Sequence, residues 1–348
     1  MTAWLEFLKA RGAVASSLAG SGPGVPLRIV GFGRPDQERE AARHGVVVCP
    51  LLDTAALLVS GPDAASFLHT QLTNDVAGLA VGDVQYNGYC SPKGRMLANF
   101  PLARAADAEY RLVVPADIAD GLARRLRMYV MRAKVVVTPL AESHVCIGIS
   151  GPVNAGAQAP SAHHEGGLTI LGLPDGRMLA VCAASSAAPF WENIERSATP
   201  AGSPVWDWLA INAGIPVITA ATQDKFVPQM LNWELVGGVN FQKGCYPGQE
   251  IVARMHYLGK LKERLYRAHV STERAPAPGA PLYGARFGEQ ACGTIVNAAP
   301  APEEGADVLA VIQIASALDD RVRIAPGADA PVLELLPLPY LVPAAVAK

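Results

Sequence analysis

This chain is organised around residues 243–254, which read Lys243-Gly244-Cys245-Tyr246-Pro247-Gly248-Gln249-Glu250-Ile251-Val252-Ala253-Arg254. It combines a thiol, two glycines, a proline, an amide, a carboxylate and cations, a mixture for which an apolar core has no use. Gly244 and Gly248 permit backbone conformations that other residues resist, or the close approach of a ligand. Apolar residues recur at helical spacing after Pro247, so the sequence predicts a loop followed by a helix from Gln249.

This pattern places Cys245 beside the N-terminus of the predicted helix, between the cations Lys243 and Arg254. Such a setting exposes a thiol and favours its reactive thiolate form. The alternative is a buried, inert cysteine in a tight loop, which is the common fate of cysteines. The charged and glycine-rich neighbours favour a functional thiol at Cys245.

The bulk composition describes a globular, rather apolar protein. The 348 residues suffice for two or three domains, with 50% hydrophobic and 17% charged residues. A net charge of −2 gives no overall attraction to nucleic acid or to anionic membranes. The longest apolar run, Val308 to Leu318, is too short to span a bilayer.

The six cysteines are scattered and contain no C-x-x-C pair, so neither a disulfide framework nor a zinc site is expected. No metal ligands are predicted elsewhere. A reducing compartment fits this cysteine usage, and the first eighteen residues lack the pattern of a secretory signal. We therefore expect a cytoplasmic protein.

The order of predicted elements indicates an α+β fold. Residues 1–45 are expected to form an N-terminal extension with a short helix and a flexible connector at Gly20–Gly24. Residues 46–259 read as an α+β region with two ferredoxin-like layers and a sub-boundary near residue 142. Residues 260–348 alternate strands with Pro/Gly-rich loops, which is typical of a small β-barrel.

Within the first layer, Asn87-Gly88 is a strong hairpin signal. Ile118, Leu122, Leu126 and Tyr129 form one stripe of a predicted helix. A second layer is indicated by a hairpin across Asp175-Gly176. Residues 216–239 have little periodicity, and a long structureless segment inside a compact domain is usually functional.

Trp206 and Trp208 are too close in sequence to share one helical face. One is expected in the core, and the other can present a flat ring to a flat ligand such as a pterin. Asp75 belongs to a polar segment, residues 72–76, for which the alternative is a capping and turn cluster. The basic turn Ser91–Arg95 either holds an anionic tail or is solvated.

The motif K-G-C-Y-x-G-Q-E-x-x-x-R resembles the signature of the YgfZ-type folate-binding proteins, which belong to the superfamily of the glycine-cleavage aminomethyltransferase (T-protein). The resemblance extends from about Val47 to Leu341. It includes residues 72–76, the turn at 91–95, the segment 213–217 and Leu336–Tyr340, in the order of the family.

The resemblance implies a central pocket for tetrahydrofolate and a role in making or repairing iron–sulfur clusters, or in sustaining enzymes that use them, including tRNA-modifying ones. Cys245 would be the thiol on which this role depends. Lys243 and Arg254 would tune it. Trp206, Asn212 and Asp75 would contact folate, and the partners would be iron–sulfur proteins or their assembly factors.

The chain departs at several positions from the superfamily that it resembles. Leu97 and Ala98 stand where true aminomethyltransferases carry adjacent aspartates, which disfavours aminomethyl transfer. Asn212 replaces a glutamate that can pair with pterin nitrogens, and Thr54 replaces a tryptophan of some members. These replacements put folate affinity in question.

Three functions are therefore compared. The leading one is a folate-binding accessory factor for iron–sulfur proteins that is not a true aminomethyltransferase. The second is a folate-dependent one-carbon transferase, against which the missing carboxylates argue. The third is an RNA-binding module using the basic helix Arg124–Lys134, but the acidic net charge counts against direct nucleic-acid binding.

Overall fold

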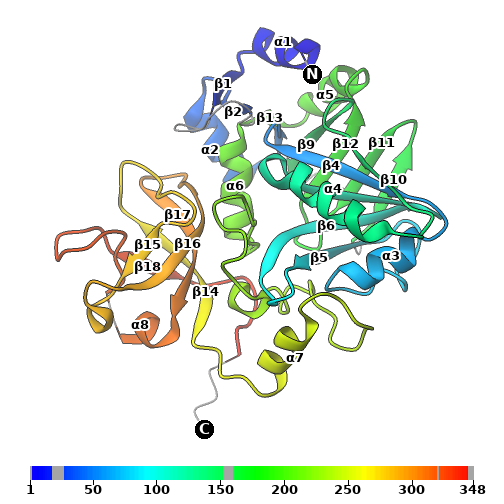
Figure 1. Ribbon diagram of the computed structural model, residues 1–348. Helices are drawn as coiled ribbons and strands as arrows, with labels where there is room; N and C mark the ends of the chain where they lie inside the picture. The colour runs from blue at the N-terminus through cyan, green and yellow to red at the C-terminus, as the bar shows by residue number, and fades with distance from the viewer. Residues whose placement is uncertain (1, 18–26, 152–159, 320, 344–348) are drawn as a thin grey trace. The chain divides into compact units, whose positions relative to one another are not determined.

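The computed structural model describes residues 2–17, 27–151, 160–319 and 321–343, and Figure 1 labels most of their helices and strands. The chain forms two compact units, which are described separately. Unit 1 comprises residues 1–87 and 99–206, and unit 2 comprises residues 88–98 and 207–348. The expected connector at Gly20–Gly24 lies outside the described residues. The expected domain boundaries near 45, 142 and 259 stay predictions.

One sheet of unit 1 has six strands in the order β10-β11-β12-β9-β3-β13. All neighbours are antiparallel, except that the short β13 runs parallel to β3. The strands are β3 (Val47–Pro50), β9 (His144–Ser150), β10 (Ala162–Glu165), β11 (Leu168–Gly172), β12 (Met178–Ala183) and β13 (Thr199–Pro200). The hairpin predicted across Asp175-Gly176 is confirmed, since it joins β11 to β12.

A second sheet has five strands in the order β5-β6-β7-β4-β8. Its strands are β4 (Thr54–Ser60), β5 (Val84–Cys90), β6 (Met96–Ala106), β7 (Glu109–Pro115) and β8 (Val136–Pro139). Helices α3 (Ala64–Gln71) and α4 (Ala116–Val130) belong to this part of unit 1, and α4 packs on β4, β7 and β8. The predicted stripe of α4 is buried at Ile118, Leu122 and Leu126, whereas Tyr129 is exposed.

The N-terminal residues are part of the core of unit 1. They form α1 (Thr2–Ala10), β1 (Val14–Ser17), β2 (Leu27–Gly31) and α2 (Pro35–His44). The ring of Trp4 meets Trp191 of α5 (Ala187–Glu195) edge to face, and Phe32 stacks on the same ring. The buried carboxylate of Glu38 accepts hydrogen bonds from the backbone N–H groups of Phe32 and Gly202. The segment is thus anchored by apolar packing and by a buried polar contact.

The hairpin predicted at Asn87-Gly88 is wrong in its position. Both residues lie inside β5, and the chain reverses later, at Ser91–Arg95. There Gly94 N–H donates to the Ser91 carbonyl, and Gly94 adopts a φ of 68°. The left-handed Gly94 completes the turn, so Asn87-Gly88 remains extended.

In unit 2, the chain between α6 (Ser203–Asn212) and α7 (Gln249–Tyr257) contains only the short 3₁₀ helix η2 (Pro228–Leu231). The predicted lack of periodicity in residues 216–239 is therefore confirmed. Further on, strands form a sheet in the order β15-β16-β17-β14-β18. They are β14 (Glu263–Val270), β15 (Pro281–Tyr283), β16 (Ala291–Pro300), β17 (Ala306–Gln313) and β18 (Leu333–Leu336), accompanied by η3 (Ala285–Phe287) and α8 (Ile314–Asp319).

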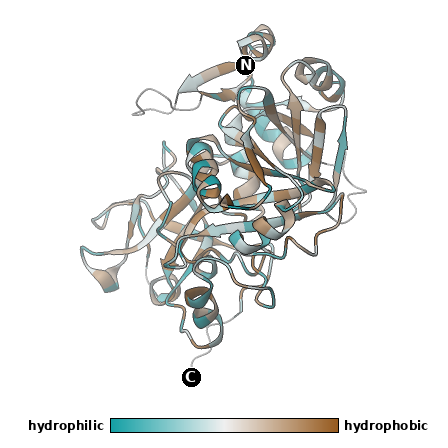
Figure 2. Cartoon of the chain, turned by 45° about the vertical axis from the view of Figure 1, so that its right-hand side comes forward, coloured by the Kyte–Doolittle hydropathy of each residue, from teal (hydrophilic) through white to brown (hydrophobic). Residues whose placement is uncertain are grey.

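This five-stranded sheet is antiparallel and has its own apolar cluster. Isolated bridges pair Arg323 with Tyr283 and with Val332. The small closed barrel that the sequence predicted is not confirmed. The α+β class is confirmed, and Figure 2 shows the apolar residues concentrated along the strands. No helix in the described ranges has both the length and the apolar character needed to cross a membrane.

Candidate functional site

Cys245 lies in unit 2, in the loop that precedes α7, and α7 begins at Gln249 as the sequence predicted. Cys245 is exposed, whereas the other five cysteines are buried. None of the six forms a disulfide, and all lie within the described residues. The loop therefore presents a thiol to solvent, which is the arrangement that a reactive cysteine needs.

Two glycines hold this loop against the turn at Ser91–Arg95. Gly248 has a φ of 80°, and a Cβ at this position would collide with the Ser91 carbonyl oxygen and with the backbone of Gly94. A Cβ at Gly94 would lie 2.9 Å from Cβ of Ile251, on α7. The two motif segments are therefore in direct backbone contact, which explains why both turns use glycine.

Lys243 and Tyr246 form the buried side of the same loop. The Lys243 ammonium lies 5.3 Å from the centroid of the Tyr246 ring, and both side chains are buried. Burial, with a further contribution from the nearby Cys90, raises the pKa of Tyr246 well above its usual range. Burial also raises the pKa of the Cys90 thiol to about 12. The structure thus places Lys243 against an aromatic ring, and its effect on Cys245 stays a prediction.

Arg254 is exposed and lies in the last turn of α7. It is five residues beyond Gln249, a rise of about 7.5 Å along a helix. Its guanidinium therefore starts from the end of α7 opposite to Cys245. An influence of Arg254 on the thiol also stays a prediction.

Two side chains of the basic turn Ser91–Arg95 form hydrogen bonds within unit 2. Ser91 Oγ donates to Asp224 Oδ1 at 2.8 Å, and the Arg95 guanidinium donates to the Lys225 carbonyl oxygen. Lys93 is exposed. Binding of an anionic tail at this turn stays a prediction.

The two tryptophans of α6 have different environments. Trp208 is buried, and its indole N–H donates to Asp307 Oδ2 at 2.8 Å within unit 2. Trp206 belongs to unit 1 and is half-buried. Its six-membered ring lies over Gly148 of β9, where an added Cβ would be 2.5 Å from Cε3. Trp206 is therefore the tryptophan whose ring remains partly accessible.

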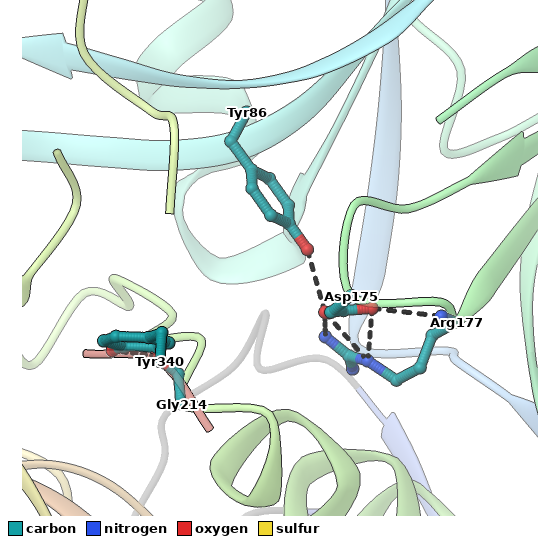
Figure 3. A network of polar contacts seen from close by, with 5 residues as sticks. All are labelled: Tyr86, Asp175, Arg177, Gly214 and Tyr340. Carbon is teal, nitrogen blue, oxygen red and sulfur yellow. Dashed lines mark hydrogen bonds and ion pairs between the residues drawn. The ribbon is translucent and has the colours of Figure 1, made fainter. Parts of the chain in front are cut away.

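A polar cluster in unit 1 lies beside Trp206, and Figure 3 shows three of its members. Cζ of Arg177 lies 4.5 Å from the centroid of the Trp206 ring. Arg177 pairs with Asp175 at 2.6 Å, and the Tyr86 hydroxyl donates to the same carboxylate at 2.8 Å. Sequence reasoning did not identify Tyr86 or Arg177 as members of a cluster, nor Asp175 as the carboxylate that joins them. The Asp175-Gly176 hairpin signal accounts only for the turn.

Asp75 makes the contacts of a turn residue. Its carboxylate accepts from Gly78 N–H at 3.0 Å and lies 3.0 Å from Nδ1 of His69. The Gly78 hydrogen bond is the main reason that the pKa of Asp75 is lowered. The neighbouring Asn74 donates its amide N–H to the Tyr86 carbonyl at 2.9 Å, which links this segment to the polar cluster. A folate contact by Asp75 itself stays a prediction.

Asn212 is the last residue of α6, belongs to unit 2 and is exposed. Two residues further on, Gly214 has a φ of 67°. The Tyr340 hydroxyl donates to the Gly214 carbonyl at 2.8 Å. Figure 3 shows the two residues next to each other. Two segments of the resemblance, residues 213–217 and 336–340, are thereby joined. The role of Asn212 in ligand binding stays a prediction.

Comparisons with known proteins show the family and the fold of this chain. Residues 30–158 match the family model described as the GCVT N-terminal domain. The chain is 31% identical over 323 residues to the tRNA-modifying protein YgfZ of Shigella sonnei (strain Ss046), a match that covers 88% of this chain and 97% of the relative. A relative of the same name from Cronobacter sakazakii is 31% identical over 327 residues, with 88% and 96% covered.

Among solved structures, the glycine cleavage system aminomethyltransferase T from Bartonella henselae matches with a TM-score of 0.78. It is 18% identical, and the match covers 96% of each chain. This likeness shows a shared fold. The near full-length matches to the tRNA-modifying proteins YgfZ show that the chain belongs to the YgfZ family.

Proposed function

We propose that this protein is a cytoplasmic, tetrahydrofolate-binding accessory factor that supports the assembly or repair of iron–sulfur clusters. Its clients are iron–sulfur enzymes, including those that modify tRNA. The proposal is supported by the motif around Cys245, by the printed name of the relatives, tRNA-modifying protein, and by the aminomethyltransferase fold.

The exposure of Cys245 carries the proposal. It is the one exposed cysteine of six. Its loop is held against the turn at Ser91–Arg95 by the backbone contact between Gly248 and Gly94. A fixed, solvent-facing thiol next to a helix N-terminus suits attack on an electrophile, a bond to iron or a mixed disulfide with a partner. In each case the thiol acts on something delivered from outside the chain.

Folate fits the residues around Trp206. A half-buried indole beside a buried guanidinium, carboxylate and phenol offers the combination of one flat apolar surface and a few fixed polar groups that small-ligand sites use. A reduced pterin has a flat ring edged with donors and acceptors, and Trp206 would contact that ring.

Aminomethyl transfer is disfavoured by β6. Leu97 and Ala98 are buried and apolar where a transferase would need a carboxylate to manage the proton of the folate amine. A folate-dependent one-carbon transferase remains the second candidate, because the fold is that of an aminomethyltransferase. Turnover of methylenetetrahydrofolate by the purified protein would favour it.

The test of the proposed function uses cells that lack the chromosomal copy and express variants at equal levels. Cys245→Ala and Cys245→Ser should both fail to restore the activity of an iron–sulfur enzyme and an iron–sulfur-dependent tRNA modification. Gln242→Ala, in the same exposed loop, is the matched control and should restore both. Full restoration by Cys245→Ala, with protein levels equal, would refute the role of the thiol.

A further inference from the structure

We propose that Arg177 is a positioning residue, held by Asp175 and Tyr86, that fixes the indole of Trp206 for a flat ligand. The inference deepens the proposed folate site and rests on it. All four residues belong to unit 1.

The first step is the attachment of Arg177 to Asp175. Nη2 of Arg177 lies 2.6 Å from Oδ2 of Asp175, and Nε lies 3.2 Å from each carboxylate oxygen. The Arg177 backbone N–H also donates to Oδ1 at 3.0 Å. Both side chains are more than nine-tenths buried. A two-pronged contact of this kind fixes the plane of the guanidinium as well as its position.

The second step is the attachment of this pair to the other sheet of unit 1. Asp175 lies in the turn between β11 and β12, whereas Tyr86 lies in β5. The Tyr86 hydroxyl is buried and donates to Oδ2 of Asp175 at 2.8 Å (Figure 3). The backbone carbonyl of Tyr86 is itself held by the Asn74 amide. The turn at 175–177 is therefore tied to β5.

The third step is the contact with Trp206. Leu179 of β12 lies opposite Gly148 of β9, so the Cβ positions of these two residues face the same side of the sheet. Arg177 comes two residues before Leu179, and therefore projects from that same side. The ideal Cβ position at Gly148 is 2.5 Å from Cε3 and 2.8 Å from both ring neighbours of Cε3, which puts Gly148 under the ring face. The ring thus lies on the sheet at Gly148, with the guanidinium 4.5 Å from its centroid. Stacking on a guanidinium favours one ring orientation.

The charges of the cluster are constant around neutral pH. Burial opposes ionisation of Asp175, but the charge and hydrogen bonds of Arg177 outweigh it and lower the carboxyl pKa. In the same way, burial acts against the charged Arg177, but Asp175 outweighs it and raises the guanidinium pKa. Burial and Asp175 together raise the pKa of Tyr86 well above 10. The guanidinium and its carboxylate partner are therefore both charged around neutral pH.

A ring fixed before binding loses less freedom when a ligand arrives, so preorganisation increases affinity. Removing the guanidinium should therefore release Trp206 and weaken the binding of a flat ligand. Arg104, another arginine of unit 1, lies 5.9 Å from the centroid of the Tyr110 ring and provides a matched control for loss of a guanidinium–ring contact.

The experiment has a ligand-free arm and a ligand arm. In the first, acrylamide quenching of tryptophan fluorescence is compared for wild type, Arg177→Gln and Arg104→Gln, each also in a Trp206→Phe background. The difference within each pair isolates Trp206 from the other four tryptophans. We expect Trp206 to become severalfold easier to quench in Arg177→Gln only.

In the ligand arm, tetrahydrofolate is titrated into the same proteins. Arg177→Gln should raise Kd about tenfold, Arg177→Lys should recover part of the loss, and Arg104→Gln should change nothing. If Arg177→Gln does not fold, Tyr86→Phe removes a single hydroxyl and should shift both measurements in the same direction by a smaller amount. Unchanged quenching and unchanged Kd would overturn the inference.

The two proposals fail separately. Absence of tetrahydrofolate binding by the wild-type protein would refute the folate site, and the quenching arm alone would then decide whether Arg177 positions Trp206. Binding by wild type that Arg177→Gln leaves intact would refute the positioning role and keep the folate site.

Discussion

At the residue scale, the contrast between Cys245 and the other cysteines is directly measurable. Five thiols are buried, and burial raises the pKa of Cys90 and Cys146 to about 12 and that of Cys182 to about 11. Thiolate is the reactive form, so these buried groups should be inert in the native protein. Ellman's reagent should therefore modify one thiol rapidly in the native protein, and the other five should react once denaturant is added.

Cys245→Ala is the control for this titration and should abolish the fast phase. A second thiol reacting as fast as Cys245 in the native wild-type protein would contradict the burial described here.

Gly148 provides a second test at this scale, because it lies under the Trp206 ring. In Gly148→Ala, the added methyl would sit 2.5 Å from Cε3 and must displace the indole. Tetrahydrofolate affinity should fall by about tenfold or more, the cost expected when a contact of 1–2 kcal/mol is lost. Gly121→Ala, at an exposed position of α4, is a matched control for affinity, since its Cβ would meet nothing within 4 Å. Equal affinity of Gly148→Ala and wild type would contradict the placement of the ring.

Single residues were predictable where local chemistry sets them apart. The mixture of residue types around Cys245 predicted a loop before a helix. The close spacing of Trp206 and Trp208 predicted that one of them would be buried, and Trp208 is. Tyr86 and Arg177 could not be found this way, because they are 91 positions apart in the sequence. Their contact through Asp175 exists only once two separate sheets have formed.

At the element scale, the turn between β11 and β12 should make stability depend on pH. The pKa of Asp175 is below its ordinary value of 3.8 in the folded protein, so the pair contributes fully above that value. The contribution is lost as the pH falls through the lower, folded pKa. Asp175→Asn should cost about 3–5 kcal/mol near pH 7, the usual effect of leaving a buried charge unpaired.

Denaturant unfolding of wild type and Asp175→Asn at pH 7 and at progressively lower pH measures this effect. The difference in unfolding free energy should shrink as the pH falls below 3.8. A difference that stays constant down to the acid limit of folding would show that the carboxylate charge does not stabilise the turn.

Most strands and helices followed from local pattern, and the misplaced hairpin shows where that reasoning stops. Asn87-Gly88 has the composition of a tight turn, yet it lies inside β5. The turn forms instead at Ser91–Arg95, where Gly94 packs against Ile251 of a distant helix. Both Asn87-Gly88 and Ser91–Arg95 have turn-forming residues, but the turn that forms is the second one, which packs against α7. Local propensity does not predict such a tertiary contact.

At the scale of the whole molecule, the chain passes between its two units three times, so cutting the chain once cannot separate them. Residues 88–98 belong to unit 2 and bond there to residues 223–226. Met96 N–H donates to the Phe226 carbonyl at 2.7 Å, and the Gln223 amide donates to the Leu97 carbonyl at 2.6 Å. A fragment 1–206 lacks these partners and should expose the apolar Met96 and Leu97.

We therefore expect fragment 1–206 to aggregate or to melt well below the full chain, and co-expression with 207–348 to restore a soluble complex. Size-exclusion chromatography and thermal melts measure both. A monodisperse fragment 1–206 with the melting temperature of the full chain would contradict this division.

The α+β class was predictable because strands and helices differ in hydrophobic period, and the family was predictable from one twelve-residue motif. The assignment of strands to sheets was not. β3 pairs with β9 and β13, and Trp4 and Phe32 enter a core shared with Trp191. These pairings join residues that are about a hundred positions or more apart in the chain, and sequence periodicity does not encode such contacts.

The most direct test of the account is a calorimetric titration of tetrahydrofolate into wild type, Trp206→Ala and Cys245→Ala. The account predicts saturable binding by wild type, markedly weaker binding by Trp206→Ala, and wild-type affinity for Cys245→Ala, because the thiol serves a later step than folate binding. No binding by the wild-type protein, or binding that Trp206→Ala leaves unchanged, would contradict the proposed folate site.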